Sequence, residues 1–311
     1  MRRLGIGIVL LVLFMSGVVG GGTLSLFQTA AVMERGVGQP QTPLQPWLPI
    51  EPAVELTVCP EGPPICQFQK IQDAIDAAPD TPPLLPFLET PFKIPLIHIL
   101  PGIYVENLVI LKSVWLQGVG QELVTLRSIA VNTGIQTGEL STEEVLRPTV
   151  FIASSNYLVV GLEGLAIEGG LQIVGLVRGF IRNNSFKIGG ILLTGTLADL
   201  LIADNSITTT FVGIRLLKVG RIPGVGEAMS VAIVNNSLYN NQPPLGRGNA
   251  IEVWESEDVF IGLNQIFRNN RGVYILNTEN ITIQGNVFKH NNTGIHAYFS
   301  RRVSIPDNLL E

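Results

Sequence analysis

One pattern of apolar and polar positions recurs along the chain from residue 181 onward. It runs apolar, two variable residues, Asn, one variable residue, apolar, as in IRNNSF at 181–186. The aligned asparagines are Asn184, Asn205, Asn236, Asn264, Asn286 and Asn308. They are separated by 21, 31, 28, 22 and 22 residues, and the two long intervals contain Gly- and Pro-rich insertions at 219–228 and 241–248. Without these insertions each interval returns to about 21 residues, and a fixed period of that length indicates a solenoid of stacked repeats.

A second strand-like phrase recurs once per repeat, begins with Gly or Ala, and has apolar residues at positions two and four. Because side chains alternate along a strand, positions two and four face the core, and positions three and five face solvent. Position three is occupied by Gln172, Leu192, Arg215, Glu252, Tyr274 and His296. Position five is occupied by Val174, Thr194, Leu217, Trp254, Leu276 and Tyr298.

The repeated asparagines have a physical role in such a solenoid. Each coil places its strands about 4.8 Å above those of the coil before it. Corners between strands need residues that tolerate left-handed backbone angles, and Asn is one of them. Identical amides stacked in register can also hydrogen-bond along the solenoid axis. We therefore expect the six asparagines to form a structural ladder.

Residues 68–78 (FQKIQDAIDAA) form the clearest helical pattern, with one apolar stripe that ends at Pro79. A short helix before a β-solenoid covers the open first coil, whose strand edges would otherwise be free to pair. At the other end the chain stops at Glu311 inside a coil, and no closing cap follows. We therefore expect a capping helix at 68–78, and at the C-terminus either a truncated reading frame or end-to-end self-association.

The first 33 residues have a basic start, followed by a run from Leu4 to Met33 without a charged residue. This pattern is typical of an export signal, and its length also allows a membrane anchor. A cleaved signal peptide and a retained signal anchor both stay open at 1–33, and either predicts an exported chain that is periplasmic, on the cell surface or secreted. Residues 34–56 are Pro-rich and predict an extended linker, followed by the folded region at 57–311.

The two cysteines, Cys59 and Cys66, lie close together in CPEGPPIC. In an exported chain they predict a local disulfide, with free structural thiols or a metal site as the alternatives. The three histidines are not clustered with further nitrogen or sulfur ligands. Because a transition metal needs such ligands together, we expect no metal and no cofactor.

The composition supports a large core, since 46% of the residues are hydrophobic and only 14% are charged. The formal net charge of −5 argues against a nucleic-acid partner, which requires a basic surface. The same charge would mildly repel an anionic polysaccharide unless a local basic patch overrides it.

Three segments carry a resemblance to known proteins: FQKIQDAIDAAP at 68–79, ILPGIYVENLVI at 99–110 and VWLQGVG at 114–120. They resemble the cap and first coils of the pectin-lyase-like superfamily, in particular its carbohydrate-binding and sugar-hydrolase repeat domains and the periplasmic NosD-type copper-site maturation proteins. The resemblance implies an all-β fold, a single-stranded right-handed parallel β-helix with a short N-terminal capping α-helix. One such scaffold carries many functions, so the fold does not decide the chemistry.

The resemblance also implies what catalysis would require, because enzymes on this scaffold use clustered acidic residues. The aspartates of this chain are Asp73, Asp76, Asp80, Asp199, Asp204, Asp258 and Asp307. None is predicted to form a stacked pair on an exposed strand face, and Asp199 and Asp258 are expected at turns before strands. We therefore favour a protein that is not an enzyme, with a polysaccharide lyase or glycoside hydrolase as the enzymatic alternative.

The best candidate for a functional surface is the outward side of the second phrase in the last repeats. Its residues are Arg215, Glu252, Trp254, Tyr274, His296 and Tyr298. Aromatic rings beside a carboxylate and an imidazole suit a sugar, through stacking and hydrogen bonds to hydroxyls. The alternative is that the aromatic side chains shield the strand backbone, while Arg215 and Glu252 form an ion pair. The functional hypothesis is an exported protein that binds carbohydrate, and the competing hypothesis is a non-catalytic NosD-like scaffold or surface adhesion module.

Overall fold

The computed structural model describes residues 50–81, 92–129, 148–209, 212–221, 230–239 and 248–311. The chain divides into two units, Met1–Pro40 and Gln41–Glu311, and every described residue belongs to the second. The predicted signal segment 1–33 and most of the predicted linker 34–56 lie outside the described residues. In the described ranges, no helix has the length and apolar character needed to cross a bilayer.

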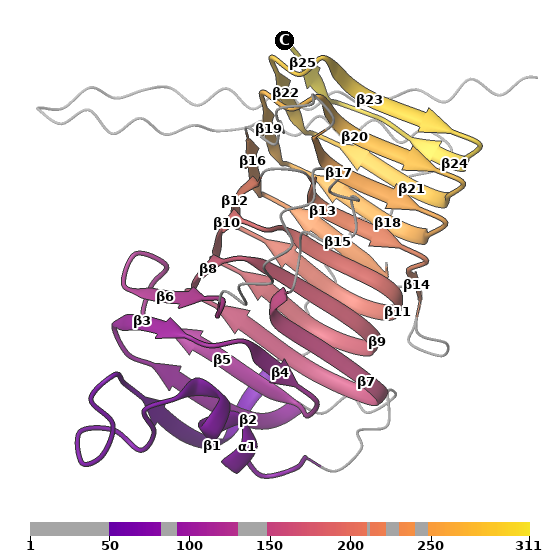
Figure 1. The fold of residues 1–311 in the computed structure, drawn as a ribbon. Helices are drawn as coiled ribbons and strands as arrows, with labels where there is room; N and C mark the ends of the chain where they lie inside the picture. The colour runs from indigo at the N-terminus through magenta and orange to yellow at the C-terminus, as the bar shows by residue number, and fades with distance from the viewer. Residues whose placement is uncertain (1–49, 82–91, 130–147, 210–211, 222–229, 240–247) are drawn as a thin grey trace, which may run out of the picture. The chain divides into compact units, whose positions relative to one another are not determined.

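The described chain folds into two parallel sheets and one short helix (Figure 1). The 16-stranded sheet contains β1 (Ile50–Val58), β2 (Phe92–Ile99), β4 (Leu108–Ile110), β5 (Val114–Gly118), β7 (Pro148–Glu163), β9 (Gly170–Arg182), β11 (Ile191–Ala203), β13 (Val212–Leu217), β14 (Gly220–Arg221), β15 (Val231–Val234), β17 (Asn249–Trp254), β18 (Glu257–Gly262), β20 (Arg271–Leu276), β21 (Glu279–Gln284), β23 (Thr293–Tyr298) and β24 (Arg301–Ser304). The 9-stranded sheet contains β3 (Gly102–Val105), β6 (Val124–Arg127), β8 (Ala166–Glu168), β10 (Ser185–Ile188), β12 (Ser206–Thr209), β16 (Ser237–Tyr239), β19 (Gln265–Phe267), β22 (Val287–Lys289) and β25 (Leu309–Leu310).

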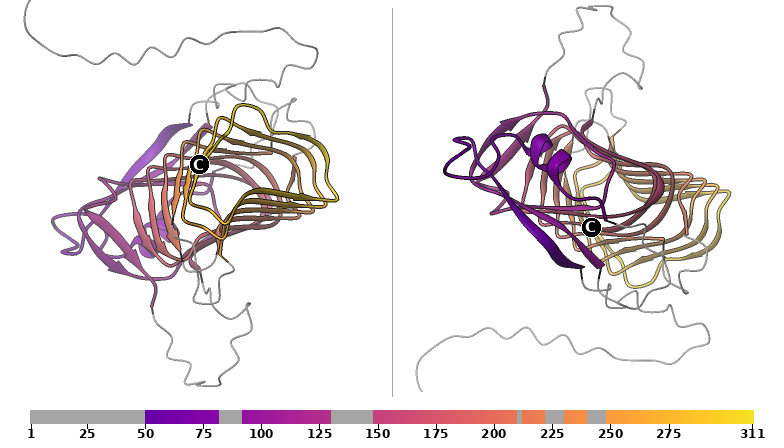
Figure 2. Two further views of the ribbon diagram at one scale, coloured as in Figure 1. Left: turned by 90° about the horizontal axis from the view of Figure 1, so that it is seen from above. Right: turned by 90° about the horizontal axis from the view of Figure 1, so that it is seen from below.

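The larger sheet is divided lengthwise by a bend into two parts. With the 9-stranded sheet, each coil therefore passes through three sheet regions. The name sheet 1 refers below to the part with β13, β17, β20 and β23. The name sheet 2 refers to the part with β15, β18, β21 and β24, and the name sheet 3 to the 9-stranded sheet. In the earlier coils β7, β9 and β11 run through both sheet 1 and sheet 2. Views along the stack show successive coils lying over one another (Figure 2). The predicted right-handed parallel β-helix is therefore confirmed.

Inward-facing aliphatic side chains form the core. Positions two and four of the sheet 1 strands stack in register, as in Ile214, Ile251 and Val273, and all three are fully buried. Burial of each such side chain contributes roughly 1.5–3 kcal/mol. The small residue at position one is also required by packing, because a Cβ at Gly272 would lie 2.6 Å from the Gly294 carbonyl oxygen and 2.5 Å from the Phe288 ring.

The six repeated asparagines stand in one row at the corner between sheets 2 and 3. From Asn205 onward each side-chain Oδ1 accepts hydrogen bonds from the backbone N–H and the Nδ2 of the asparagine one coil before it, whereas the Asn184 Oδ1 accepts from the Leu165 backbone N–H. For Asn205 and Asn236 both distances are 3.0 Å, and for Asn264 and Asn286 both are 2.9 Å. Every Nδ2 also donates to a strand carbonyl, as Asn236 does to Ile202 at 2.9 Å. The row therefore satisfies the buried polar groups of the corner, which would be costly if left unpaired.

The left-handed residue at this corner is not the ladder asparagine itself, contrary to the sequence-based expectation. It is the residue just before each one: Asn183, Asp204, Asn235, Leu263, Gly285 and Asp307, with φ between 53° and 65°. The ladder asparagine needs its side chain directed into the corner, so the turn in the backbone falls on its neighbour. Leu263 is the apolar member of this set.

The N-terminal helix α1 spans Ile71–Ala77 and is shorter than the predicted 68–78. Phe68 instead forms a parallel bridge with Val58, so the helix starts only after it. The Glu106 carboxylate accepts hydrogen bonds from the backbone N–H of Ile71 at 3.0 Å and of Gln72 at 3.1 Å. This carboxylate from the next coil satisfies the helix start, where negative charge is favourable. The helix lies across the N-terminal end of the stack (Figure 2, right).

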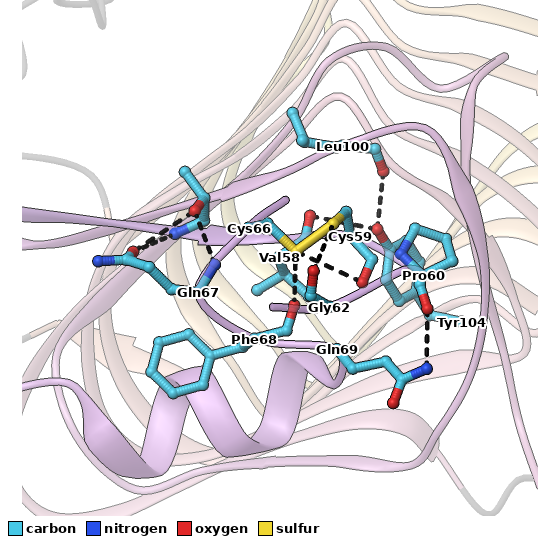
Figure 3. The surroundings of a disulfide bond; sticks show 11 residues. Val58, Cys59, Pro60, Gly62, Cys66, Gln67, Phe68, Gln69, Leu100 and Tyr104 are labelled. Atoms are coloured by element: carbon cyan, nitrogen blue, oxygen red, sulfur yellow. Dashed lines mark hydrogen bonds between the residues drawn. A yellow bond between two sulfur atoms is a disulfide. The ribbon is translucent and has the colours of Figure 1, made fainter. Parts of the chain in front are cut away.

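Cys59 and Cys66 form a disulfide beside this helix, with a Cα–Cα distance of 5.9 Å (Figure 3). It closes the loop between β1 and α1. Strand β1 begins at Ile50, so the boundary predicted at residue 57 is wrong: the last residues of the Pro-rich 34–56 segment are a strand paired with β2. An edge strand tolerates a proline such as Pro52, because its outer N–H groups need no ladder partner.

Replacing Asn236 by leucine is expected to lower stability by about 3 kcal/mol or more. The change removes the acceptor of the buried Asn205 backbone N–H, one of the two acceptors of the Asn205 Nδ2, and the side-chain donor to the Ile202 carbonyl, at about 1–3 kcal/mol for each group left unpaired. Urea-induced unfolding followed by circular dichroism measures the shift in midpoint. Asn292→Ala is the control, because Asn292 is exposed and its change is expected to stay within about 0.5 kcal/mol. Equal shifts for both variants would contradict a structural ladder.

Replacing Leu263 by asparagine is expected to raise stability by about 0.5–1 kcal/mol. Leu263 has φ +58° and is 61% exposed, and an L-residue in this region costs roughly 1–2 kcal/mol, less for asparagine. The thermal midpoint measures the gain. Ile188→Asn is the control for removing an exposed apolar side chain, since Ile188 is 59% exposed and lies in a regular strand. A gain in the control and not in Leu263→Asn would refute the backbone explanation.

Candidate functional site

The six residues selected from the sequence lie together on the outer face of sheet 1. Strand register places Arg215, Glu252, Tyr274 and His296 in one column along β13, β17, β20 and β23. The neighbouring column contains Leu217, Trp254, Leu276 and Tyr298. We call the surface formed by the two columns the aromatic face.

Glu252 is the buried polar centre of the aromatic face. Only 3% of this residue is exposed. Its Oε2 lies 2.6 Å from the Arg215 Nε, and its Oε1 accepts a hydrogen bond from the Asn249 Nδ2 at 2.5 Å. Both carboxylate oxygens are thus occupied. Arg215 and Glu252 do form the ion pair that the structural alternative requires.

The rings of the aromatic face contact one another from coil to coil. Ring centroids are separated by 6.1 Å for Trp254 and Tyr274, 5.3 Å for Tyr274 and His296, and 4.8 Å for His296 and Tyr298. The Arg215 guanidinium lies 5.3 Å from the Trp254 ring, and that of Arg271 lies 4.6 Å from the Tyr274 ring. Edge-to-face and cation–π contacts of this kind add stability. The row therefore has a structural role whether or not it binds a ligand.

Two buried polar atoms of this surface have no hydrogen-bond partner within the described chain. They are the Nε1 donor of Trp254 and the Oδ1 acceptor of Asn249, a residue that is only 4% exposed. An unpaired buried group costs roughly 1–3 kcal/mol. One donor and one acceptor at the base of the aromatic face are therefore left without hydrogen bonds by the described residues.

A groove of about 870 Å³ adjoins the aromatic face at the corner between sheets 1 and 2. Its lining includes Lys218, Glu255, Ser256, Glu257, Thr278, Glu279, Phe299, Ser300 and Arg301. Hydroxyl groups join the coils on its floor, since the Ser256 Oγ accepts from the Val219 N–H at 3.0 Å and the Thr278 Oγ1 donates to the Ser300 Oγ at 2.9 Å. Glu255 directly follows Trp254, and Phe299 directly follows Tyr298, so the two surfaces are continuous.

A second buried ion pair lies on the outer side of sheet 2. Arg178 Nε and Asp199 Oδ2 are 2.8 Å apart and both residues are buried. Burial raises the pKa of the Asp199 carboxyl, and the Arg178 guanidinium partly offsets this. The expectation that Asp199 lies at a turn is wrong, because Asp199 lies within strand β11. Asp258 is the second residue of β18 and has the left-handed φ of 57° that is typical of a turn.

Sequence reasoning missed Asn249, Arg271 and Phe299. Asn249 directly precedes the repeated phrase, and its hydrogen bond to Glu252 is not predicted by the two-residue alternation. Phe299 is 82% exposed, and its position next to Tyr298 in the sequence could have indicated that it belongs to the same surface. Among the described residues, no group of three His, Cys, Asp or Glu side chains has the geometry of a metal site.

Comparison with known proteins agrees with the fold. A family model described as "Right handed beta helix region" matches residues 222–311. No curated protein matches the chain. Among solved structures, the pectin methylesterase PemA from Erwinia chrysanthemi is similar at 15% identity over 78% of this chain and 80% of its own, with a TM-score of 0.42. ORF18 of Geobacillus virus E2 is similar at 13% identity over 74% and 57%, with a TM-score of 0.36. The mannuronan C-5 epimerase AlgE6 A-module of Azotobacter vinelandii is similar at 11% identity over 78% and 94%, with a TM-score of 0.22.

The Arg178–Asp199 pair is expected to behave as a structural pair. Asp199→Leu alone leaves a buried guanidinium without its counter-ion and should lower stability by about 3–5 kcal/mol. The double variant Arg178→Met with Asp199→Leu should return to near the original stability, because an apolar pair needs no compensation. Urea unfolding midpoints of the three proteins provide the measurement. Additive losses in the double variant would show that the two residues do not act as a pair.

Proposed function

We propose that the aromatic face binds carbohydrate and holds it without a catalytic step. The observation that supports this most directly is the combination of a continuous row of rings with an unpartnered donor and an unpartnered acceptor, both buried at its base. A sugar ring presents apolar C–H faces that pack on aromatic rings. Its hydroxyl groups donate and accept hydrogen bonds, so one hydroxyl complements either unpartnered atom.

The geometry around Glu252 supports binding over catalysis. Acid–base chemistry on a glycosidic bond uses two carboxyl groups with different pKa values facing the same bond. Glu252 has both oxygens engaged by Arg215 and Asn249, and its neighbours in the two columns of the aromatic face include no second carboxylate. A lyase or glycoside hydrolase activity is therefore the less favoured alternative.

We also propose that the chain acts outside the cytoplasm. The Cys59–Cys66 disulfide supports this, because such bonds persist in oxidising compartments. A non-catalytic NosD-like scaffold or an adhesion module would be exported as well. The alternatives differ from our proposal in one measurable respect, which is that purified protein would retain no glycan on an array.

Trp254→Phe is expected to weaken oligosaccharide binding about 5- to 10-fold while leaving stability unchanged or slightly raised. The variant keeps a six-membered aromatic ring and removes the five-membered ring of the indole with its Nε1 donor, and one hydrogen bond of this kind is worth about 1 kcal/mol or somewhat more. A glycan array identifies a bound oligosaccharide, and isothermal titration calorimetry then gives its Kd.

Trp115→Phe is the matched control, because Trp115 also has an unpartnered buried Nε1 and packs edge-on to Phe180, but lies on β5, away from the aromatic face. Tyr298→Ala should also reduce binding with little change in the thermal midpoint, since Tyr298 is 49% exposed. If the control weakens binding as much as Trp254→Phe does, the aromatic face is not the binding surface.

A further inference from the structure

We propose that the corner groove and the aromatic face form one binding surface for an uncharged polysaccharide chain that lies along the solenoid axis. This inference rests on the proposed function and adds the substrate class and the second half of the site. The observations that carry it are the continuity of the two surfaces, the pairing of the charges on them, and one like-charged pair that the fold does not need.

The two surfaces meet at two places, each formed by two residues that are consecutive in the chain. Tyr298 on the face and Phe299 in the groove have ring centroids 5.8 Å apart. Trp254 and Glu255 make the same connection two coils earlier. The groove is lined by the same corner in four successive coils, at 218–220, 255–257, 277–279 and 299–301. With strands about 4.8 Å apart, it extends for about 14 Å along the axis, which is room for several sugar units.

Strand register elsewhere on the solenoid pairs opposite charges between neighbouring coils. Arg127 lies over Glu168, Glu163 over Arg182, Arg178 over Asp199, and Arg215 over Glu252. In the groove, Glu257 and Glu279 are register partners. Among the described strand pairs this is the one register pair with like charges, and like charges directly opposite one another are destabilising. Glu279 has Arg301 as its register partner on the other side, whereas Glu257 has no cation as a register partner among the described strand pairs, and this points to a ligand that uses Glu257.

Carboxylates in this position suit hydroxyl groups. Glu257 is exposed and forms no ion pair within the described chain, whereas Glu279 also contacts Arg302 and Glu255 lies 3.7 Å from the Lys218 Nζ. Carboxylate oxygens accept strong hydrogen bonds from O–H donors. The unpartnered Oδ1 of Asn249 on the adjoining face is a further acceptor. The surface therefore favours a ligand rich in hydroxyl donors.

The same charges disfavour a polyuronate, which carries a carboxylate on every sugar. The groove contains three carboxylates, Glu255, Glu257 and Glu279, against two cations, Lys218 and Arg301. On the aromatic face, the Arg215 guanidinium is already bound to Glu252. A polyanion would therefore meet few unpaired cations here, and the chain's net charge of −5 adds long-range repulsion.

The test is calorimetric titration of the purified full chain with neutral hexasaccharides (cellohexaose, mannohexaose and laminarihexaose) and with hexagalacturonate. We expect at least one neutral hexasaccharide to bind 10-fold or more tightly than hexagalacturonate. Phe299→Ala and Glu257→Gln should each weaken that neutral ligand several-fold. Glu257→Gln should at the same time raise the thermal midpoint, because it removes the like-charged pair.

The double variant Glu255→Lys with Glu257→Lys should bind hexagalacturonate at least 10-fold better than the original protein, and added salt should reduce the gain. The double variant Glu61→Lys with Glu122→Lys, at two exposed positions outside the groove, is the matched charge control and should change nothing. Tighter binding of hexagalacturonate by the original protein, or unchanged neutral binding in Phe299→Ala and Glu257→Gln, would overturn the inference and leave the proposed function standing, provided that Trp254→Phe weakens binding. Absence of binding to every probe would overturn both.

Discussion

The structure depends on the in-register stacking of parallel coils. Every coil must place the same kind of side chain inward, because a shift by one residue would turn the apolar side chains of Ile251 and Val253 to solvent. The asparagine row fixes this register at one corner, where each buried amide is bonded to the next coil. Burial of the aliphatic columns supplies most of the free energy of folding, and the amide row disfavours other registers between the coils.

This constraint leaves the outward positions free to vary, and the candidate site consists of them. The predicted insertions at 219–228 and 241–248 separate β13 from β15 and β16 from β17 in the sequence, and the strands on either side still pair in register, as Ile214 does with Ile251. Side chains on β17, β20 and β23 are therefore held at the fixed spacing of the coils. A surface that is already in place spends little free energy on ordering when a ligand binds.

The sequence alone was sufficient to predict the features that repeat from coil to coil. The period, the asparagine row, the inward positions and the two columns of the aromatic face all follow from residues that recur at fixed offsets. Features that occur once were not predictable in the same way: the strand within the Pro-rich segment at Ile50, the hydrogen bond of Asn249 to Glu252, and the groove that Phe299 helps to line. They depend on tertiary contacts of single residues, for which a repeat pattern contains no information.

The stacking of coils also limits which ligands the outer surface of a sheet can recognise. A row of equal charges along the axis would place like charges about 4.8 Å apart, and each step would be destabilising. The observed solution is an alternation of sign, as in Arg178 with Asp199 and Arg215 with Glu252. A row of rings has no such penalty, because neighbouring aromatic side chains attract one another. The stacking that stabilises the fold thus favours recognition by aromatic rings and by groups that hydrogen-bond to hydroxyls. A uniform row of charges that binds a polyion would instead destabilise the stack.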